Sequence, residues 1–548
     1  MLGDLAWLLG AAGLVRLYIV LVTFAVKGDS AGLVGMAQDL DAGRYGEFLA
    51  FEQHPLFSVL VAFFHLAIDD WVLAGQAVGW LATTLTVPAV YLWCRRAAGR
   101  QVGLAAGVLV AVHPELARFS GAVLAESVYF LFFATSLWLG LAAAQERRRL
   151  PAVLAGGGIA LAYLSRPEGV VLLPFLLVAL WFTRGPDGKR GGKQSTILSA
   201  CVVGGYLLLA FPYIAALSWG VGYPKASNKK YGDLFECLRF KEPELWAIPM
   251  EKPLSPAIQG RVEGLLASLA RDHGVAESHG DPHAPGAPDR WEQTLRNTYY
   301  PREVEAKARE GDWLPAKFVN AMHGVVLALV ALGLLPIRGL RRIRGEPWLA
   351  GIVASFAAIL LRINHTEFYI STRHALSMAV PCLAWAGRGL LVLAPALVWV
   401  WRRLPARIVP RPRPEGWFAR RPAAFWAGAL VTALLAPLTL KPQDLHARDE
   451  KEIGKWLGDR GARGRTVMSS DGRVSFYAGA EYCPVTQWGG YAELLTDVLA
   501  RDVAYVVSDP GDQFKIEHLV LEGWLVEVWP LEGEDLQTKL RVFRVELK

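Results

Sequence analysis

Long runs of apolar residues, separated by short polar segments, dominate the first 440 residues of the chain. A membrane-spanning helix needs about 20 mostly apolar residues, and the pattern predicts eleven such helices. They cover residues 5–26, 71–94, 102–116, 127–144, 150–164, 169–182, 195–218, 318–336, 347–361, 375–401 and 422–440. The third, fifth and sixth are short for a full crossing, so we expect them to be partly buried against their neighbours. The pattern therefore predicts a mainly α, polytopic membrane helical bundle.

The pattern changes after residue 440. Residues 449–457 place Ile453, Trp456 and Leu457 on one helical face. Short β-type runs follow at residues 466–470, 503–508, 525–529 and 542–547. Since about 100 residues suffice for a small domain, we predict two domains. The first, residues 1–440, spans the membrane and includes the polar loops 27–70 and 219–317. The second, residues 441–548, is a small C-terminal α/β domain.

Basic residues predict how the helices are oriented. Clusters of Arg and Lys lie at residues 95–100, 147–149, 184–193, 338–344 and 402–421, and each follows an even-numbered predicted span. Because cytoplasmic loops are enriched in Arg and Lys, we expect these loops and the N-terminus on the cytoplasmic side. The C-terminal domain is then extracytoplasmic. The first span lacks a basic n-region and a cleavage site, so we interpret it as a retained helix.

The composition agrees with a membrane protein, and the distribution of charge argues against a nucleic-acid partner. Of the 548 residues, 53% are hydrophobic and only 20% are charged, which excludes disordered and fibrous classes and disfavours a soluble enzyme. The net charge of +7 alone would suggest a nucleic-acid partner. However, the five basic segments hold 21 of the 57 Lys and Arg residues and only four acids in or beside them. The charge therefore reflects topology, and we expect no nucleic-acid partner.

Ionisable residues gather in four turns that this orientation places on the outer side. These turns contain, in order, Asp29, Tyr45 and His54; His113 and Glu126; Arg166 and Glu168; and His365, Glu367, Tyr369, Arg373 and His374. A carboxylate can take a proton from an attacking hydroxyl or amine. Arg and His can hold a phosphate leaving group and offset its charge. Together these residues indicate group transfer from a lipid phosphate at the outer membrane face.

Each of these residues also has a structural alternative. Asp29 could be a solvated residue where a span ends. Arg166 could pair with a neighbouring glutamate to hold a turn, and Glu126 could be a carboxylate at a helix N-terminus. Arg373 and His374 could be anchors at headgroup depth. Outside the turns, Cys237 and Cys483 lie in polar segments, and either a disulfide between them or unrelated roles fits their positions.

Four stretches resemble the GT-C superfamily of integral-membrane glycosyltransferases, in the bacterial branch similar to aminoarabinose transferases and protein O-mannosyltransferases. They are Gly28-Asp29-Ser30 with Tyr45 downstream, Glu52-Gln53-His54-Pro55-Leu56, Tyr163-Leu164-Ser165-Arg166-Pro167-Glu168-Gly169, and Tyr369 with Arg373-His374. Their order and their shared outer location carry the resemblance, which covers roughly residues 5–390. Relatives often have a second acid directly after the first-loop aspartate. Here that residue is Ser30, so Asp29 would act alone or with an acid from another turn.

The resemblance implies an enzyme of the bacterial inner membrane that takes a sugar from a polyprenyl-phosphate-linked donor. The sugar would pass, with inversion, to a lipid, glycan or protein acceptor at the extracytoplasmic face. Asp29 would be the catalytic base, or would hold the acceptor or a metal; a divalent metal could take part, with unknown ligands. Donor-phosphate binding would fall to Arg166, Arg373, His374, Lys229 and Lys230. The substrate pocket would contain Tyr45, His54, His113, Glu126, Glu168, His365, Glu367 and Tyr369.

Other functions on the same scaffold stay open. One is a transferase of another cargo, such as an oligosaccharide. A second is a transporter or flippase for lipid-linked sugars, which would place charges near the bilayer midplane, whereas here they lie in outer-side turns. A third is a non-catalytic assembly factor, against which the presence of Asp29, Arg166 and Arg373 argues.

Overall fold

A computed structural model describes most of the predicted membrane domain and much of the tail. The described residues are 1–23, 28–183, 192–228, 314–336, 343–367, 371–403, 423–441, 447–470, 472–484, 494, 498–499, 501–508, 516, 519–521, 523–529 and 540–546. They divide into two compact units. We call the described residues up to 441 the helical unit and those from 447 the tail unit.

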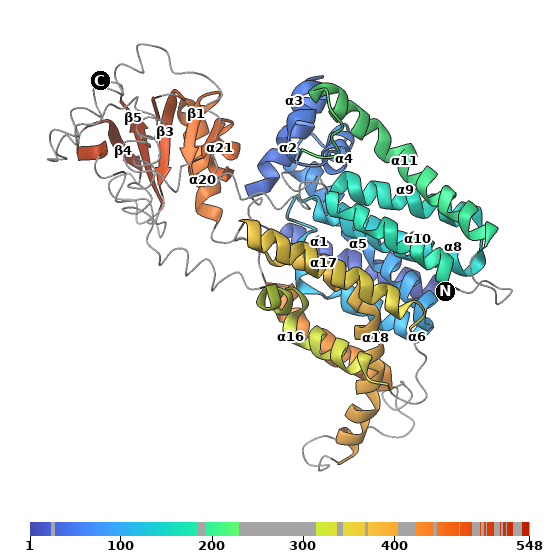
Figure 1. Ribbon diagram of the computed structural model, residues 1–548. Helices are drawn as coiled ribbons and strands as arrows, with labels where there is room; N and C mark the ends of the chain where they lie inside the picture. Colours follow the sequence, from blue (N-terminus) through green and yellow to red (C-terminus); the bar gives the residue numbers. More distant parts are fainter. Residues whose placement is uncertain are drawn as a thin grey trace, which may run out of the picture. The chain divides into compact units, whose positions relative to one another are not determined.

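The helical unit contains long apolar helices at the positions that the sequence predicts (Figure 1). Among the described residues, seven helices are long and apolar enough to cross a membrane. They are α1 (Leu2–Leu21), α5 (Trp71–Ala98), α8 (Glu126–Glu146), α11 (Lys193–Val221), α16 (Leu314–Leu334), α17 (Glu346–Glu367) and α18 (Thr372–Arg403). The prediction of a polytopic membrane bundle is confirmed.

Shorter apolar helices occupy the remaining predicted spans. These are α6 (Arg100–Ala111), α9 (Arg149–Ser165), η1 (Pro167–Val171) with α10 (Leu172–Phe182), and α19 (Ala423–Thr439). The third predicted span ends earlier than expected, because Pro114 starts a separate short helix, α7 (Pro114–Arg118). His113 caps that helix, with its Nδ1 accepting a hydrogen bond from the Leu116 N–H at 3.4 Å. The turn of ionisable residues after α6 is thus fixed by a helix start.

The segment between the first two long helices is itself helical. It contains α2 (Gly28–Asp41), α3 (Tyr45–Ala50) and α4 (Leu56–His65). The apolar pattern predicts only a polar loop at residues 27–70, because none of these helices is long enough to cross a bilayer. Asp29 therefore lies in the first turn of α2 and not in an extended loop.

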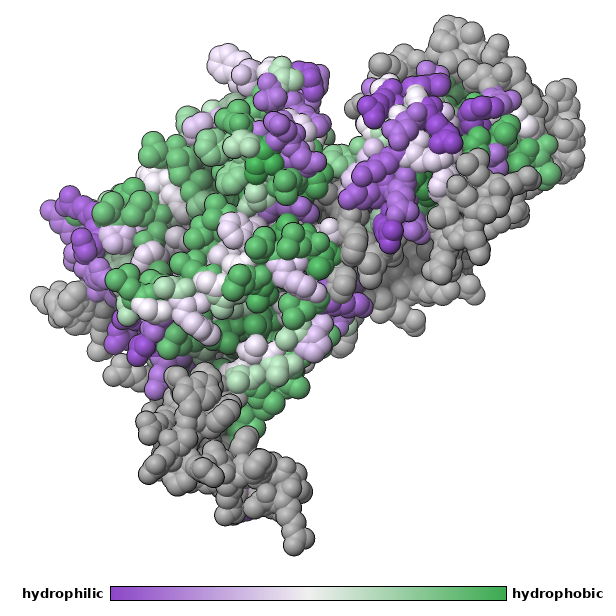
Figure 2. All heavy atoms as spheres, turned by 180° about the vertical axis from the view of Figure 1, so that it is seen from behind, coloured by the Kyte–Doolittle hydropathy of each residue, from purple (hydrophilic) through white to green (hydrophobic). Residues whose placement is uncertain are grey.

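The surface of the helical unit is suited to lipid. Figure 2 shows apolar side chains spread over the visible face of this unit. Among the most exposed large apolar side chains are Leu14, Leu21, Leu208 and Trp219, each at least 70% exposed. Exposed apolar surface of this extent is not typical of a soluble monomer. It agrees with the membrane location that the apolar runs predict.

Glycines bring several helices into backbone contact. A Cβ atom added at Gly333 of α16 would lie 1.8 Å from the Trp385 carbonyl oxygen of α18, and one added at Gly389 of α18 would lie 1.8 Å from the Leu329 carbonyl oxygen of α16. Membrane helices associate closely through such small residues. The helices α16 and α18 are therefore packed at a distance that no larger side chain allows.

A buried arginine ties α1 to α6. Arg16 is fully buried, and its Nη1 and Nη2 donate to the carbonyl oxygens of Ala111 and Val110, both at 3.0 Å. The last carbonyls of a helix have no intrahelical partners, and a cation at this end also interacts favourably with the helix dipole. Arg16 therefore caps the C-terminal end of α6 from a neighbouring helix.

Arg16→Met is expected to lower the free energy of unfolding by about 1–3 kcal/mol, because two buried carbonyl groups lose their donor. The melting temperature of the purified protein in detergent measures this loss. Leu17→Met, at the next and exposed position of α1, is the matched control and should leave the melting temperature unchanged. Equal melting temperatures for both variants would show that the cap contributes no stability.

The tail unit is a five-stranded mixed sheet in the order β2-β1-β3-β5-β4. Its strands are β1 (Thr466–Ser469), β2 (Glu481–Pro484), β3 (Val503–Ser508), β4 (Leu525–Trp529) and β5 (Arg541–Val545), with helices α20 (Arg448–Leu457) and α21 (Arg473–Ala478). The strand β1 pairs in parallel with β2 and β3, whereas β5 pairs antiparallel with β3 and β4. The predicted helix and four predicted strands are confirmed. β2 was missed, because its four residues include a charge and a proline.

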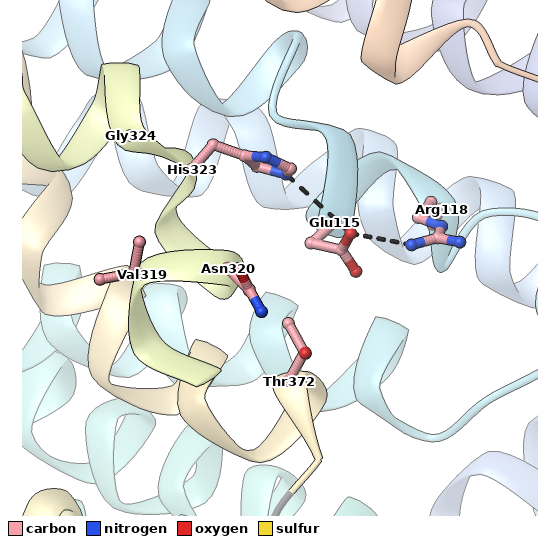
Figure 3. Close-up of a pocket in the computed structure, with 7 residues that line it drawn as sticks. All are labelled: Glu115, Arg118, Val319, Asn320, His323, Gly324 and Thr372. Atoms are coloured by element: carbon pink, nitrogen blue, oxygen red, sulfur yellow. Dashed lines mark hydrogen bonds and ion pairs between the residues drawn. The ribbon is translucent and has the colours of Figure 1, made fainter. Parts of the chain in front are cut away.

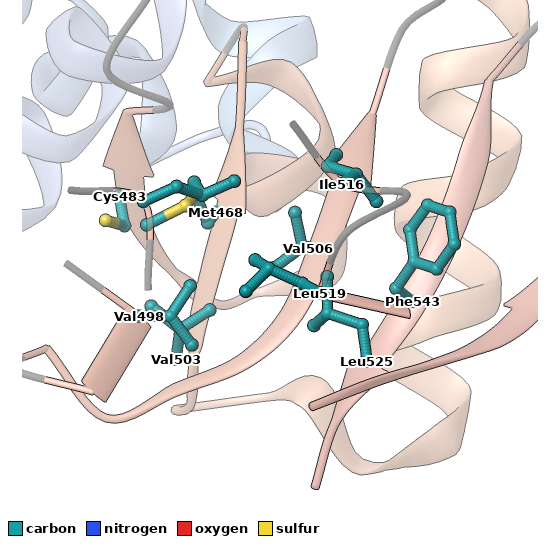
Figure 4. Close-up of a cluster of buried hydrophobic side chains, with 10 residues drawn as sticks. Met468, Cys483, Val498, Val503, Val506, Ile516, Leu519, Leu525 and Phe543 are labelled. Carbon is teal, nitrogen blue, oxygen red and sulfur yellow. The ribbon is translucent and has the colours of Figure 1, made fainter. Parts of the chain in front are cut away.

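Both faces of this sheet are buried. Met468, Val506 and Phe543 pack on one face (Figure 4). Their sequence neighbours Val467, Val507 and Val542 pack on the other face with Ile453 and Leu457 of α20. Successive residues of a strand point to opposite faces, so each strand serves two apolar layers. The predicted small α/β fold is confirmed.

Candidate functional site

Five charged side chains of the helical unit meet at the ends of several helices. Asp29 comes from the first turn of α2, Glu126 is the first residue of α8, and Arg373 is the second residue of α18. Arg166 follows the last residue of α9, and Glu168 lies in η1. We call these five residues the charged cluster. All of them were candidates from the sequence, although they lie up to 344 positions apart.

Acids and bases alternate along the charged cluster. Arg373 is ion-paired with Asp29, and its Nε lies 3.7 Å from Glu126 Oε1. Glu126 is in turn paired with Arg166. The other side of the Arg166 guanidinium faces Glu168, with Nη2 3.0 Å from Oε1 and Nε 3.3 Å from Oε2. The chain of contacts therefore runs Asp29, Arg373, Glu126, Arg166, Glu168.

Burial decreases along the charged cluster toward Asp29. The side chains of Glu126 and Arg166 are 3% and 8% exposed, whereas those of Arg373 and Asp29 are 29% and 43% exposed. Burial lowers the pKa of Arg166, but the neighbouring carboxylates of Glu168 and Glu126 outweigh this effect and raise it above its ordinary value. Arg166 stays cationic. The inner pair is therefore a fixed support, and the Asp29–Arg373 pair is the accessible end.

The local sequence explains the position of Arg166. A residue before proline is forced out of the helical region, and Arg166 is accordingly extended, with φ −152° and ψ 135°. This ends α9 at Ser165. Two residues after Pro167, a Cβ atom at Gly169 would lie 2.4 Å from the Tyr163 backbone nitrogen, so only glycine fits there. The Arg-Pro-Glu-Gly sequence is thus a compact turn that presents Arg166 and Glu168 together.

A second group of predicted residues lies around His54. Its Nε2 is 2.8 Å from the Ser227 hydroxyl oxygen, and its ring packs against Tyr163 with centroids 4.9 Å apart. The Tyr163 hydroxyl donates to the Ala226 carbonyl oxygen. Asn228 donates to the carbonyl oxygens of Leu49 and Phe51. Residues 226–228 are thereby held against the segment that precedes His54.

The structure places the other predicted site residues as follows. Tyr45, at the start of α3, is 64% exposed and is not brought to the charged cluster. His374 follows Arg373, with its Nδ1 3.3 Å from the Ser371 backbone nitrogen, which donates to it. His113 is fully buried, with its ring 5.6 Å from that of His323. His365 and Glu367 lie in the last turn of α17. Lys229, Lys230, Tyr369 and Cys237 lie outside the described residues.

Sequence reasoning missed several residues of these surroundings. Asn228 gave no signal beyond its polarity after an apolar run, and Tyr163 belongs to a stretch that carries the resemblance but was given no role. His323 was missed because it is a single histidine inside the apolar run of α16. A histidine in a spanning segment is itself a pointer to function, and that signal could have found it.

The described part of the chain offers a metal no evident ligand set. Within it, no group of three or more His, Cys, Asp and Glu side chains could hold a metal ion. In the charged cluster each carboxylate already faces an arginine. No step of the chemistry below is therefore assigned to a metal.

Comparison with known proteins adds a family and a fold. Residues 52–215 match the family described as dolichyl-phosphate-mannose-protein mannosyltransferase. No curated protein matches the chain by sequence. The matched residues include the whole Glu52–Leu56 stretch, Glu126 and the Arg-Pro-Glu-Gly turn.

Two solved structures resemble the chain over most of its length. ArnT from Cupriavidus metallidurans, solved with bound undecaprenyl phosphate, has a TM-score of 0.55 at 12% identity, with 99% of this chain and 98% of that chain covered. The oligosaccharyltransferase of Archaeoglobus fulgidus, in its apo form, has a TM-score of 0.51 at 13% identity, with 93% and 71% covered. The chain is thus a multi-helix membrane protein with the fold of the GT-C superfamily of glycosyltransferases, as its sequence resemblance predicted.

Proposed function

We propose that the chain transfers a sugar from a polyprenyl-phosphate-linked donor to an acceptor at the extracytoplasmic membrane face. The observation that carries this proposal is the accessible pair of Asp29 and Arg373 at the end of an otherwise buried charged cluster. The family match at residues 52–215 supports a lipid-phosphate sugar as donor. So does the similarity in fold to a protein solved with undecaprenyl phosphate.

In an inverting transfer, Asp29 would act on the acceptor and Arg373 on the donor. The acceptor hydroxyl or amine attacks the anomeric carbon on the face opposite the phosphate and passes its proton to the Asp29 carboxylate. The bond between the anomeric carbon and the phosphate oxygen breaks, and both its electrons stay with the polyprenyl phosphate. The Arg373 guanidinium holds that phosphate and offsets the charge that develops on it.

The ion pair between these residues implies an order of events. A donor phosphate competes with the Asp29 carboxylate for Arg373, because both are anions that an arginine binds through its planar fork. When the phosphate takes Arg373, the Asp29 carboxylate is released from its ion pair and can face the acceptor. Donor binding would therefore activate the base, so that the acceptor is attacked only when the donor is in place.

Arg166 has a different role in this scheme from the one its sequence suggests. The family resemblance implies that Arg166 binds the donor phosphate. Its three guanidinium nitrogens already face Glu168 and Glu126, and its side chain is only 8% exposed. We assign it to holding Glu126, which in turn orients Arg373. Further ligands of the donor phosphate stay predictions from sequence: His374, Lys229 and Lys230.

The arrangement across the membrane is proposed from the basic loops. Five clusters of Arg and Lys follow even-numbered spans, which supports a cytoplasmic N-terminus in a bacterial inner membrane. The tail, residues 441–548, would then be extracytoplasmic. Acceptor candidates are a lipid, a glycan or a protein.

Release of polyprenyl phosphate tests the function. The purified full-length chain, incubated in detergent with a panel of polyprenyl-phosphate sugars and a membrane extract as acceptor source, should release polyprenyl phosphate from at least one donor. A transporter or flippase would move such a lipid across a vesicle bilayer without cleaving it. Translocation in vesicles with no release from any donor would therefore contradict a transferase.

A further inference from the structure

A cavity of about 350 Å³, lined mostly by polar residues, lies between α7, the middle of α16 and the first residue of α18. Thr372, which lines it, directly precedes Arg373. Figure 3 shows the side chains of Glu115, Asn320, His323 and Thr372 around one open space. None of the proposed roles above uses these four residues.

The backbone of α16 is broken at this cavity. His323 has φ 55° and ψ 143°, far from helical values, in the middle of a helix long enough to span a membrane. Such a conformation is strained for a residue other than glycine, and strained residues cluster at functional sites. At membrane depth, irregular backbone is tolerated where it is buried in protein or lines a polar cavity. The break therefore opens α16 at the place where the cavity lies.

Within the described part of the chain, His323 Nε2 has no hydrogen-bond partner. Its closest carboxylate oxygen, Glu115 Oε1, is 3.9 Å away, which is too long for a hydrogen bond. The separation leaves no room for an atom between them, so a bridging hydroxyl has to lie beside the pair, accepting from His323 and donating to Glu115. The ring of the buried His113 packs edge-on against that of His323, with centroids 5.6 Å apart. Glu115 and His323 both line the cavity, so one ligand hydroxyl in it can bond to both side chains.

The remaining side chains provide both donors and acceptors without an excess of charge. Arg118 Nη1 holds Glu115 Oε1 at 2.8 Å, so one acid faces one base. Asn320 adds an amide that donates and accepts, and Thr372 adds a hydroxyl. This set suits a neutral ring with several hydroxyl groups and disfavours an isolated cation or anion. Pockets for small ligands have volumes of about 300–1,000 Å³. The volume of this cavity is at the lower end of that range, which suits one sugar ring and not a chain of rings.

We propose that this cavity binds a single sugar ring, with one ring hydroxyl bridging Glu115 and His323 and another bonded to Asn320 or Thr372. The proposal rests on the proposed function and assigns its sugar-binding subsite. The ring belongs either to the donor, with its phosphate on Arg373, or to the end of a glycan acceptor. Adjacent residues of α18 would then serve the phosphate and the ring.

The test measures binding by the purified full-length protein, with Gly324→Leu as the variant that fills the cavity. Gly324 lines the cavity, and a Cβ atom there would have no neighbour within 4 Å, so the added side chain enters open space. Gly204→Leu is the matched control, since Gly204 of α11 also has no such neighbour and is exposed outside the cavity. Asn320→Ala is a second variant that removes an amide and adds no bulk. Melting temperatures in detergent verify that each variant is folded.

The donor arm compares undecaprenyl phosphate with its mannose, glucose and arabinose esters. For the wild type and Gly204→Leu, at least one ester should bind more tightly than the bare lipid phosphate by about tenfold or more, the effect of roughly one hydrogen bond to a charged group. Gly324→Leu and Asn320→Ala should lose that advantage and bind the bare lipid phosphate as the wild type does. The acceptor arm uses the methyl glycosides of the same sugars, observed by saturation-transfer NMR. Loss of their signals in both variants, with unchanged donor affinity, assigns the ring to the acceptor.

Two results separate this proposal from the proposed function. If both variants bind every probe of both arms as the wild type does, the sugar subsite is overturned even where transfer is observed. If sugar-dependent binding is lost in the variants but no donor ever releases polyprenyl phosphate, the subsite stands and the transferase function fails.

Discussion

Asp29→Asn is expected to slow sugar transfer by about 10²–10⁴-fold, the typical contribution of a general base. The amide has the shape of the carboxylate but cannot take the acceptor proton. The yield and melting temperature should not change, because the Asp29 side chain is 43% exposed and supports no buried group. Release of polyprenyl phosphate from a radiolabelled or fluorescent donor measures the rate.

Asp39→Asn is the matched control for this variant. Asp39 lies on the same helix, α2, where it pairs with the exposed Arg44. Its loss should leave the rate nearly unchanged, because its partner is Arg44, which is outside the charged cluster. A rate of Asp29→Asn close to that of Asp39→Asn would remove Asp29 from the role of base.

Arg166→Met is expected to lower the free energy of unfolding by about 3–5 kcal/mol, the usual effect of removing one partner from a buried ion pair. The variant leaves Glu126 nearly fully buried without its closest cation, and Glu168 loses both of its bonds to the guanidinium. Thermal or denaturant unfolding in detergent measures the loss.

Two companion variants make the interpretation specific. Arg148→Met removes an exposed arginine that is 3.7 Å from Glu146 and should change the stability by about 0–1 kcal/mol. Adding Glu126→Gln to Arg166→Met should restore part of the stability, because the buried carboxylate is then neutral. If Arg166→Met is no more harmful than Arg148→Met, the charged cluster is not a buried support.

The sequence predicted the membrane helices well for a physical reason. The thickness of the bilayer sets the length of an apolar run, so each span is visible locally, and all eleven predicted segments contain helix. The same reasoning missed α2, α3 and α4, because helices that do not cross the bilayer leave no run of the required length. It missed β2 because two of its four residues, Glu481 and Pro484, are unfavourable in strands.

The candidate site could be predicted only in part. Asp29, Glu126, Arg166, Glu168 and Arg373 were each recognisable as ionisable residues in turns next to apolar runs. Their order of contact was not recognisable, because apolar runs report depth in the membrane and not which helices are neighbours. The pair of Arg166 with Glu168 lies within one turn and was an alternative that the sequence offered. The contacts of Arg166 with Glu126 and of Arg373 with Asp29 depend on helix packing.

The glycine contacts between α16 and α18 have a consequence for where motion can occur. The backbones of these helices are in contact at Gly333 and Gly389. Packing this close leaves no space in which one helix could slide along the other. Arg373 and the cavity lined by His323 therefore belong to one stiff frame. Asp29 lies on the short helix α2, which is outside that frame. That helix is itself held in place, because the buried Ser30 hydroxyl donates to the Ala122 carbonyl oxygen. A donor that separates Asp29 from Arg373 should therefore be accommodated by rotation of these two partly exposed side chains, and not by movement of a whole helix.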